Sequence, residues 1–292
     1  TGIRNVAVGY TALFNTLEDE NTAVGNASMA GNTTGECNTA LGSFSLCTNT
    51  TADNNTAVGF CALKTNTTGA SNTAVGTLAL TSNTTALGIT AVGKDSLKAN
   101  TTGGNNTAVG LCSLRNNQTG GNNTAIGFRA AEDTTGSSNT ALGSCSLFDN
   151  SSGANNTAIG TQALANNTTA VSNTAIGAFS LLTNTTGTNN SGLGFCSLYS
   201  NTTGNSNTAL GHLAMCDNTE GESNTAIGRL ALAVNITGDF NVAIGEQALR
   251  CATTPDSNTA IGHYTLRNTS TGANNTAVGV NALTSNTTAF AN

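Results

Sequence analysis

The chain has 292 residues, of which 37% are hydrophobic, 8% charged and 4% aromatic, with no Trp and a formal net charge of −6. So few aromatic and charged residues argue against a conventional globular core, and 34 Gly beside a single Pro exclude collagen and proline-rich disorder. Nine Lys and Arg are too few for a nucleic-acid interface, and no apolar run reaches the roughly 20 residues that span a bilayer.

One pentapeptide, Asn-Thr-Ala-(Val/Ile/Leu)-Gly, recurs along the whole chain at intervals of 16 or 17 residues. With its Asn as repeat position 0, the consensus is N-T-A-(V/I/L)-G-x-x-(A/S)-L-x-x-N-T-T-G-x-x. The copies begin at Asn5, Asn21, Asn38, Asn55, Asn72, Ile89, Asn106, Asn123, Asn139, Asn156, Asn173, Asn190, Asn207, Asn224, Asn241, Asn258 and Asn275. We therefore expect one continuous repeat domain over residues 1–292, as a fragment of a longer chain.

Each repeat is predicted to form short strands. Two Gly positions, abundant Asn and Thr, and the lack of an i, i+3, i+4 apolar pattern argue against helices. We predict strands at repeat positions 1–3 and 6–8, a Gly corner at position 4 that needs a positive φ, and an Asn-Thr-Thr-Gly loop at positions 11–14. Stacked about 4.8 Å apart, such units form an all-β parallel β-solenoid, or β-roll, of about 17 coils with one 16–17-residue repeat per coil.

The columns made by stacking have different chemistry. Position 3 is always aliphatic and position 8 is mostly Leu, so these two columns are predicted to form the interior. Strand alternation then places position 1 on the same face as position 3, and the Ala of position 2 on the opposite face. Small residues at positions 2 and 7 predict close packing, either against the other wall of the same coil or against a neighbouring chain. The Asn of position 0 is expected to form an amide ladder along the stack.

The pentapeptides Asn21-Thr-Ala-Val-Gly25 and Asn123-Thr-Ala-Ile-Gly127 resemble the head repeats of trimeric autotransporter adhesins. The longer unit from Ala62 to Gly69 is similar to repeats of tail-fibre-like proteins that carry a C-terminal chaperone. The resemblance implies a left-handed β-roll that trimerises into an extracellular head or stalk.

We therefore expect a non-catalytic structural fibre or adhesin shaft, extracellular or on a cell surface. It would associate with itself, as a homotrimer or end to end, and could bind host or surface ligands. No nucleic acid, membrane segment or cofactor is expected. The alternative is an ice-binding solenoid with an exposed Thr ladder at position 1. An enzyme is disfavoured because a carbohydrate-degrading β-helix needs a local carboxylate cluster, which this uniform chain lacks.

No metal or catalytic residue is expected. His212 and His263 both occupy position 5 but lie three coils apart, too far to share an ion. The carboxylates of residues 18–20 and of Glu132 and Asp133 coincide with the two 16-residue repeats, and are interpreted as solvated loop variants.

Two kinds of covalent site are predicted. Cysteines in the same or adjacent coils could form disulfides, as Cys37 with Cys47, Cys47 with Cys61, or Cys196 with Cys216. Glycosylation sequons at position 11 are expected on an outward ridge; they are Asn32, Asn49, Asn66, Asn83, Asn100, Asn117, Asn150, Asn167, Asn184, Asn201, Asn235 and Asn286. Further sequons lie one residue before the strand, at Asn54, Asn105, Asn122, Asn155, Asn189 and Asn274.

Overall fold

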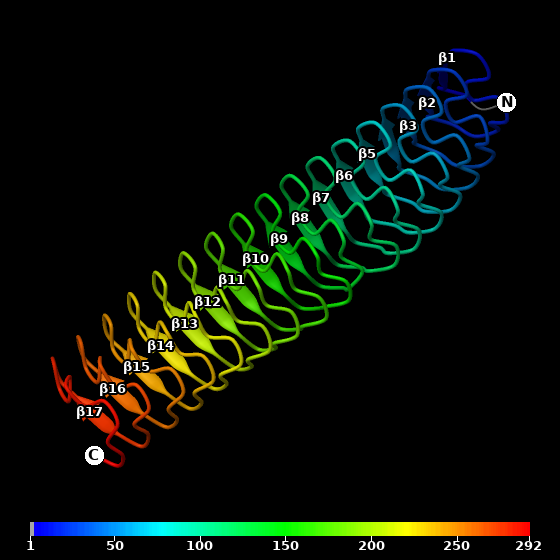
Figure 1. Ribbon diagram of the computed structural model, residues 1–292. Coiled ribbons are helices and arrows are strands. Elements are labelled where there is room, and N and C mark those ends of the chain that lie inside the picture. Colours follow the sequence, from blue (N-terminus) through cyan, green and yellow to red (C-terminus); the bar gives the residue numbers. More distant parts are fainter. Residues whose placement is uncertain (1–2) are drawn as a thin grey trace. The chain divides into compact units, whose positions relative to one another are not determined.

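The computed structural model describes residues 3–292, which divide into two compact units, one ending at Ser144 and one beginning at Cys145. Figure 1 shows short strands stacked coil on coil within each unit. Across the described residues there are strands and turns but no helix. The predicted all-β parallel solenoid, with one repeat per coil, is therefore confirmed.

Each coil contributes one three-residue strand. The first unit contains β1 (Val6–Val8), β2 (Thr22–Val24), β3 (Thr39–Leu41), β4 (Thr56–Val58), β5 (Thr73–Val75), β6 (Thr90–Val92), β7 (Thr107–Val109), β8 (Thr124–Ile126) and β9 (Thr140–Leu142). The second contains β10 (Thr157–Ile159), β11 (Thr174–Ile176), β12 (Ser191–Leu193), β13 (Thr208–Leu210), β14 (Thr225–Ile227), β15 (Val242–Ile244), β16 (Thr259–Ile261) and β17 (Thr276–Val278).

Within each unit, neighbouring strands pair in parallel and in register, so identical repeat positions stack directly. In the β2–β3 pair, for example, Thr22 lies opposite Thr39 and Ala23 opposite Ala40. Backbone hydrogen bonds between neighbouring coils continue beyond the strands. The Leu46 N–H, for example, donates to the Ala62 carbonyl at 3.0 Å. Almost the whole contour of a coil is thus tied to the next coil, which satisfies backbone groups that three-residue strands alone would leave unpaired.

The predicted second strand at positions 6–8 is wrong. These residues form a turn in which positions 6 and 8 are left-handed, with φ of 58° at Phe44 and 48° at Leu46. A left-handed residue other than Gly costs about 1–2 kcal/mol, but the turn directs the Leu46 side chain fully into the interior. Burying a leucine contributes about 1.5–3 kcal/mol, which offsets that strain.

The glycine of position 4 adopts the predicted positive φ, between 124° and 140° in every coil. There is also no room for a side chain, because a Cβ on Gly42 would lie 2.6 Å from the Gly59 carbonyl oxygen. Where position 14 is glycine, its backbone has no such φ and the constraint is space: a Cβ on Gly35 would lie 2.4 Å from the Ala52 oxygen and 2.5 Å from Oδ1 of Asn32. Ala52, Ala86, Ala170 and Pro255 occupy the same position in other coils, which therefore accommodate a Cβ there.

The interior differs from the prediction in one column. Leu at position 8 is buried as predicted, but so is the Ala of position 2, whereas the aliphatic residue of position 3 faces outward. The two small columns face each other, since a Cβ on Gly192 at position 2 would lie 2.5 Å from Oγ of Ser180 at position 7. Their close packing is therefore against the other wall of the chain's own coils, and a neighbouring chain is not what holds these positions small.

Candidate interaction face

The aliphatic residues of position 3 form an outward-facing column along each unit, exposed in eight strands and half-buried in the other nine. Val24 is 36% exposed, Leu41 38% and Ile126 42% in the first unit, and Leu193 is 42% and Ile261 38% exposed in the second. Their burial pattern follows strand alternation, with the central alanine buried and its neighbours facing outward. The column is contiguous, because neighbouring strands stack in register.

Threonine at position 1 shares this outward side. Most of these threonines are half-buried, and those of β13 and β17 are exposed. Val6 and Val242 take the place of Thr in β1 and β15. We call the position 1 and position 3 side chains together the strand face. Each unit thus presents two adjacent uncharged columns, one of hydroxyls and methyls and one of aliphatic groups.

The predicted outward ridge of glycosylation sequons at position 11 is wrong. Eleven of the twelve asparagines are buried, and only Asn286 in the last coil is half-buried. Their Nδ2 atoms, which would carry the glycan, are used inside the coil. Nδ2 of Asn49 donates to Oδ1 of Asn32 at 2.8 Å and to the Ala52 oxygen at 2.9 Å. A glycan replaces one of the two Nδ2 hydrogens, so at least one of these bonds would be lost, and the fully buried side chain leaves no space for a sugar. Glycosylation of Asn49 is therefore incompatible with the folded coil.

Position 11 therefore forms a second amide ladder. It runs from Asn32 to Asn117 in the first unit and from Asn150 to Asn235 in the second, each Nδ2 donating to Oδ1 of the preceding coil. The ladder predicted at position 0 is confirmed, with Asn38 donating through both its backbone N–H and Nδ2 to Oδ1 of Asn21. The two columns form a polar interior beside the leucines.

The six sequons that precede the strands lie elsewhere. Asn54, Asn105, Asn122, Asn155, Asn189 and Asn274 are all exposed, and their φ values lie between 57° and 60°. Asparagine is among the residues that tolerate this left-handed conformation best, which gives a structural reason for its place there.

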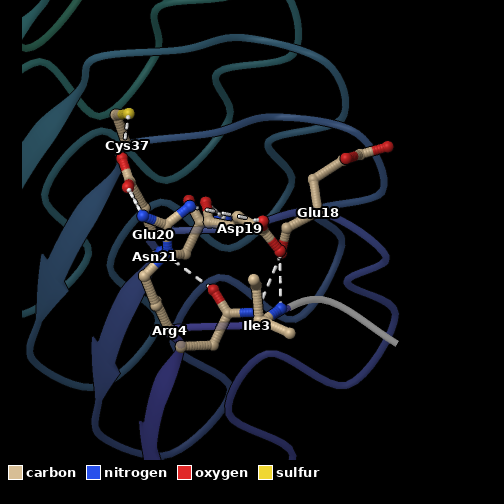
Figure 2. Close-up of polar contacts among 8 residues, drawn as sticks. Ile3, Arg4, Glu18, Asp19, Glu20, Asn21 and Cys37 are labelled. Atoms are coloured by element: carbon tan, nitrogen blue, oxygen red, sulfur yellow. Dashed lines mark hydrogen bonds and ion pairs between the residues drawn. The ribbon is translucent and has the colours of Figure 1, made fainter.

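The candidate disulfide cysteines are free thiols in the structure. Cys37 is exposed, Cys61 is buried, and Cys47, Cys196 and Cys216 are intermediate. The Sγ of Cys37 donates to a Glu20 carboxylate oxygen at 3.4 Å (Figure 2). The three proposed pairings thus stay predictions for an oxidised form.

The first carboxylate cluster is built around Arg4. Figure 2 shows its guanidinium beside Asp19 and Glu20, at 3.8 Å and 2.9 Å from their carboxylates. Carboxylates of the next loops, on Glu36 and Asp53, continue the cluster, and the Glu36 N–H donates to Asp53 at 2.8 Å. Partial desolvation and then the charge of Glu18 raise the pKa of Glu36.

In the second cluster Asp133 is half-buried, whereas Glu132 is buried rather than solvated as predicted. The Glu132 side chain is 5% exposed and is held by two arginines, Arg115 at 3.5 Å and Arg129 in closer contact. This carboxylate bridges arginines of two neighbouring coils, which is a structural role.

The histidines lie at the surface beside aromatic rings. His212 stacks on Phe195 with ring centroids 5.5 Å apart, and His263 stacks on Tyr264 at 3.7 Å. Within residues 3–292 no three His, Cys, Asp or Glu side chains are grouped so that they could hold a metal ion. Nor does that part of the chain contain a helix long and apolar enough to cross a membrane.

A scan against models of protein families and a search of curated proteins both give no match to this chain.

Proposed function

We propose that this chain is a non-catalytic structural element, the shaft or head of an extracellular fibre or adhesin, and that its copies associate through the strand face. The supporting observation is the outward-facing aliphatic column at position 3, whose side chains are exposed or half-buried. Soluble monomers rarely expose contiguous apolar patches larger than about 300–600 Å², and larger ones mark association sites. The extracellular location rests on the resemblance of the pentapeptide repeats to adhesin heads.

A copy of the same chain is the partner that fits this face best. The strand face repeats once per coil and carries no charge, so a complementary surface must have the same repeat over the same length. Another copy of the chain has that repeat because its sequence is the same. The resemblance favours three copies around a common axis, in which each strand face would be covered by its neighbours.

Light scattering of the intact chain tests this proposal. We expect a mass that is a multiple of 29.0 kDa, with three copies favoured. A mass of 29.0 kDa that does not rise at micromolar and higher concentrations would contradict it.

Ice binding is the second candidate, and the structure strengthens it in one respect. The threonines of position 1 face outward beside the aliphatic column, as in β10 with Thr157 and Ile159, rather than into the core. A regular outward ladder of hydroxyls and methyls could order surface water. Because ice would need the same face that copies would cover, the two functions exclude each other on any one molecule.

Thermal hysteresis of the freezing point separates the two functions. The fibre proposal predicts none from the associated protein. A monomer that shapes ice crystals and slows their growth would favour the ice-binding hypothesis instead.

A further inference from the structure

Two arginines of neighbouring coils converge on one buried amide in the second unit. Arg250, in the coil of β15, and Arg267, in the coil of β16, both occupy position 9. Nη1 of Arg250 and Nε of Arg267 donate to Oε1 of Gln247, at 3.4 Å and 2.9 Å. The amide is 7% exposed, whereas both arginines are half-buried. Two positive charges are thus held beside each other, within reach of solvent, on a neutral acceptor.

An aromatic ring helps to fix this pair. The guanidinium of Arg267 lies over the Tyr264 ring, 5.1 Å from its centroid. A guanidinium stacked in this way and bonded to a buried oxygen has few conformations left, so it would lose little entropy on binding a ligand. The arginines are therefore placed before any ligand arrives.

No carboxylate neutralises the pair. Among residues 3–292, neither Arg250 nor Arg267 forms an ion pair. The carboxylate of Glu246 is bound by Arg229 at 2.5 Å, and that hydrogen bond lowers the pKa of Glu246. A guanidinium has five N–H donors, and each of the pair uses one for the amide oxygen. The other side-chain donors have no acceptor within the described chain.

The first unit contains the same arrangement with a counter-charge. There Arg115 and Arg129, also from neighbouring coils, converge on Glu132, which is 5% exposed. The shared acceptor is a buried carboxylate rather than a buried amide. The two clusters therefore differ mainly by one negative charge at the point where the arginines meet.

We propose that Arg250 and Arg267 bind an oxyanion, a sulfate or phosphate group, which supplies the counter-charge that Gln247 lacks. The planar guanidinium matches the oxygens of such groups with two parallel hydrogen bonds, and two arginines match a doubly charged one. Position 9 lies beyond the position 7 wall that faces the strand, so the site is separate from the strand face. The inference goes beyond the proposed function and does not depend on self-association.

Nuclear magnetic resonance of the arginine Nε–Hε groups in the intact chain tests the site directly, because each guanidinium is followed separately. Sodium sulfate and sodium phosphate are titrated at constant ionic strength, with sodium chloride as the reference. We expect the signals of Arg250 and Arg267 to shift together and to saturate. Those of Arg115 and Arg129 should stay in place, because Glu132 already neutralises them.

Exchanging the two acceptors provides the variants. Gln247→Glu supplies the missing charge and should weaken oxyanion binding at least about tenfold, because a carboxylate repels the ligand. Glu132→Gln removes the charge from the first unit and should create a second site at Arg115 and Arg129. Gln162→Glu adds the same charge at position 6 of the β10 coil and should leave binding unchanged. Circular dichroism of each variant reports whether the β structure is kept.

Dextran sulfate, with uncharged dextran as its control, separates the two sources of the group. Tighter binding per sulfate than for the inorganic ion would assign the site to sulfate esters of a polymer, and equal binding would assign it to the free ion. Signals of Arg250 and Arg267 that move no further in sulfate or phosphate than in chloride would overturn the inference. A folded Gln247→Glu chain that binds like the wild type would overturn it too, as would equal shifts of all arginines.

Discussion

Single side chains decide where the buried amide ladders end. Nδ2 of Asn235 donates to Asn218 at 2.7 Å, but its Oδ1 has no partner, because the next coil has Ala252 where an asparagine would continue the ladder. The same happens at Asn117, whose Oδ1 is unpaired where Thr134 follows at position 11. A buried acceptor left without a donor costs about 1–3 kcal/mol.

Completing the ladder should therefore stabilise the second unit. We expect Ala252→Asn to raise the free energy of unfolding by about 1 kcal/mol, since its Nδ2 would reach Oδ1 of Asn235. Chemical denaturation measures the change. Ala252→Asp, nearly the same in size but an acceptor when ionised, should destabilise the protein, and equal effects of the two variants would contradict the ladder argument.

The thiol of Cys216 should be unreactive in the folded protein. Burial, and then the neighbouring Asp217 carboxylate, raise its pKa to about 12. Because the thiolate is the reactive form, we expect alkylation at pH 8 to be about a hundredfold or more slower than for an unfolded cysteine, as followed by mass spectrometry of the modified peptide. Asp217→Asn should increase the rate of Cys216 alkylation, because it removes a negative charge that raises the pKa of the thiol. Rapid alkylation of the native wild type would be inconsistent with this environment.

Ionisation of Glu36 should make the stability of the folded protein depend on pH. Its pKa is raised in the fold, so its ionisation opposes folding: stability associated with it is present at low pH and is lost as the pH rises through the raised pKa. Glu36→Gln should therefore raise the melting temperature slightly at pH 7, with no difference at a pH well below 4. A wild type that melts higher than the variant at pH 7 would refute the argument.

At the scale of a coil, the glycine corners fix how closely coils stack. Gly110 has a φ of 139°, and a Cβ there would lie 2.3 Å from the Gly127 oxygen. Gly104, in the loop before the same strand, has no such φ, and a Cβ would find its nearest atom at 3.3 Å. Gly110 is thus constrained by both its φ and the space around it, whereas Gly104 is constrained by neither to the same degree.

Replacing these glycines by alanine should therefore give different results. Gly110→Ala combines steric overlap with backbone strain, and we expect it to cost about 3 kcal/mol or more. Gly104→Ala should cost less than about 1 kcal/mol. Thermal unfolding of both variants measures the difference, and similar losses would show that the corner geometry does not govern stacking.

The sequence predicts the coil length, the first strand and the glycine corner, because each depends on a local residue preference repeated in every copy. It does not predict the turn at positions 6–8, because Leu46 adopts a left-handed conformation that leucine alone disfavours. Only packing inside the coil makes that conformation favourable, and packing is not visible in one repeat.

The strand faces are the reverse of those predicted, although the sequence contained a pattern that indicates the correct orientation. Asparagine at position 0 was expected to stack in a ladder, and strand alternation places positions 0 and 2 on the same side. The buried ladder of Asn21 and Asn38 thus requires Ala23 to point inward and Val24 outward. The sequence-based prediction placed position 3 inside because its residues are aliphatic, and it therefore missed that positions 0 and 2 share the inward side.

At the scale of the whole molecule, the large apolar residues divide into two columns with different surroundings. Position 8 holds each coil together from inside, whereas position 3 lies outside and is free to hold copies together. The coil of β10 contains both kinds, Leu164 with no exposed surface and Ile159 on the strand face.

The most direct test compares Ile159→Asp with Leu164→Asp, reading secondary structure by circular dichroism and mass by light scattering on the same samples. We predict that Ile159→Asp keeps the β spectrum and loses association, because its charge would meet the partner's apolar column. Leu164→Asp should lose folding, since an unpaired charge in the interior costs several kcal/mol. If Ile159→Asp unfolds the chain, or stays associated like the wild type, the central claim is wrong.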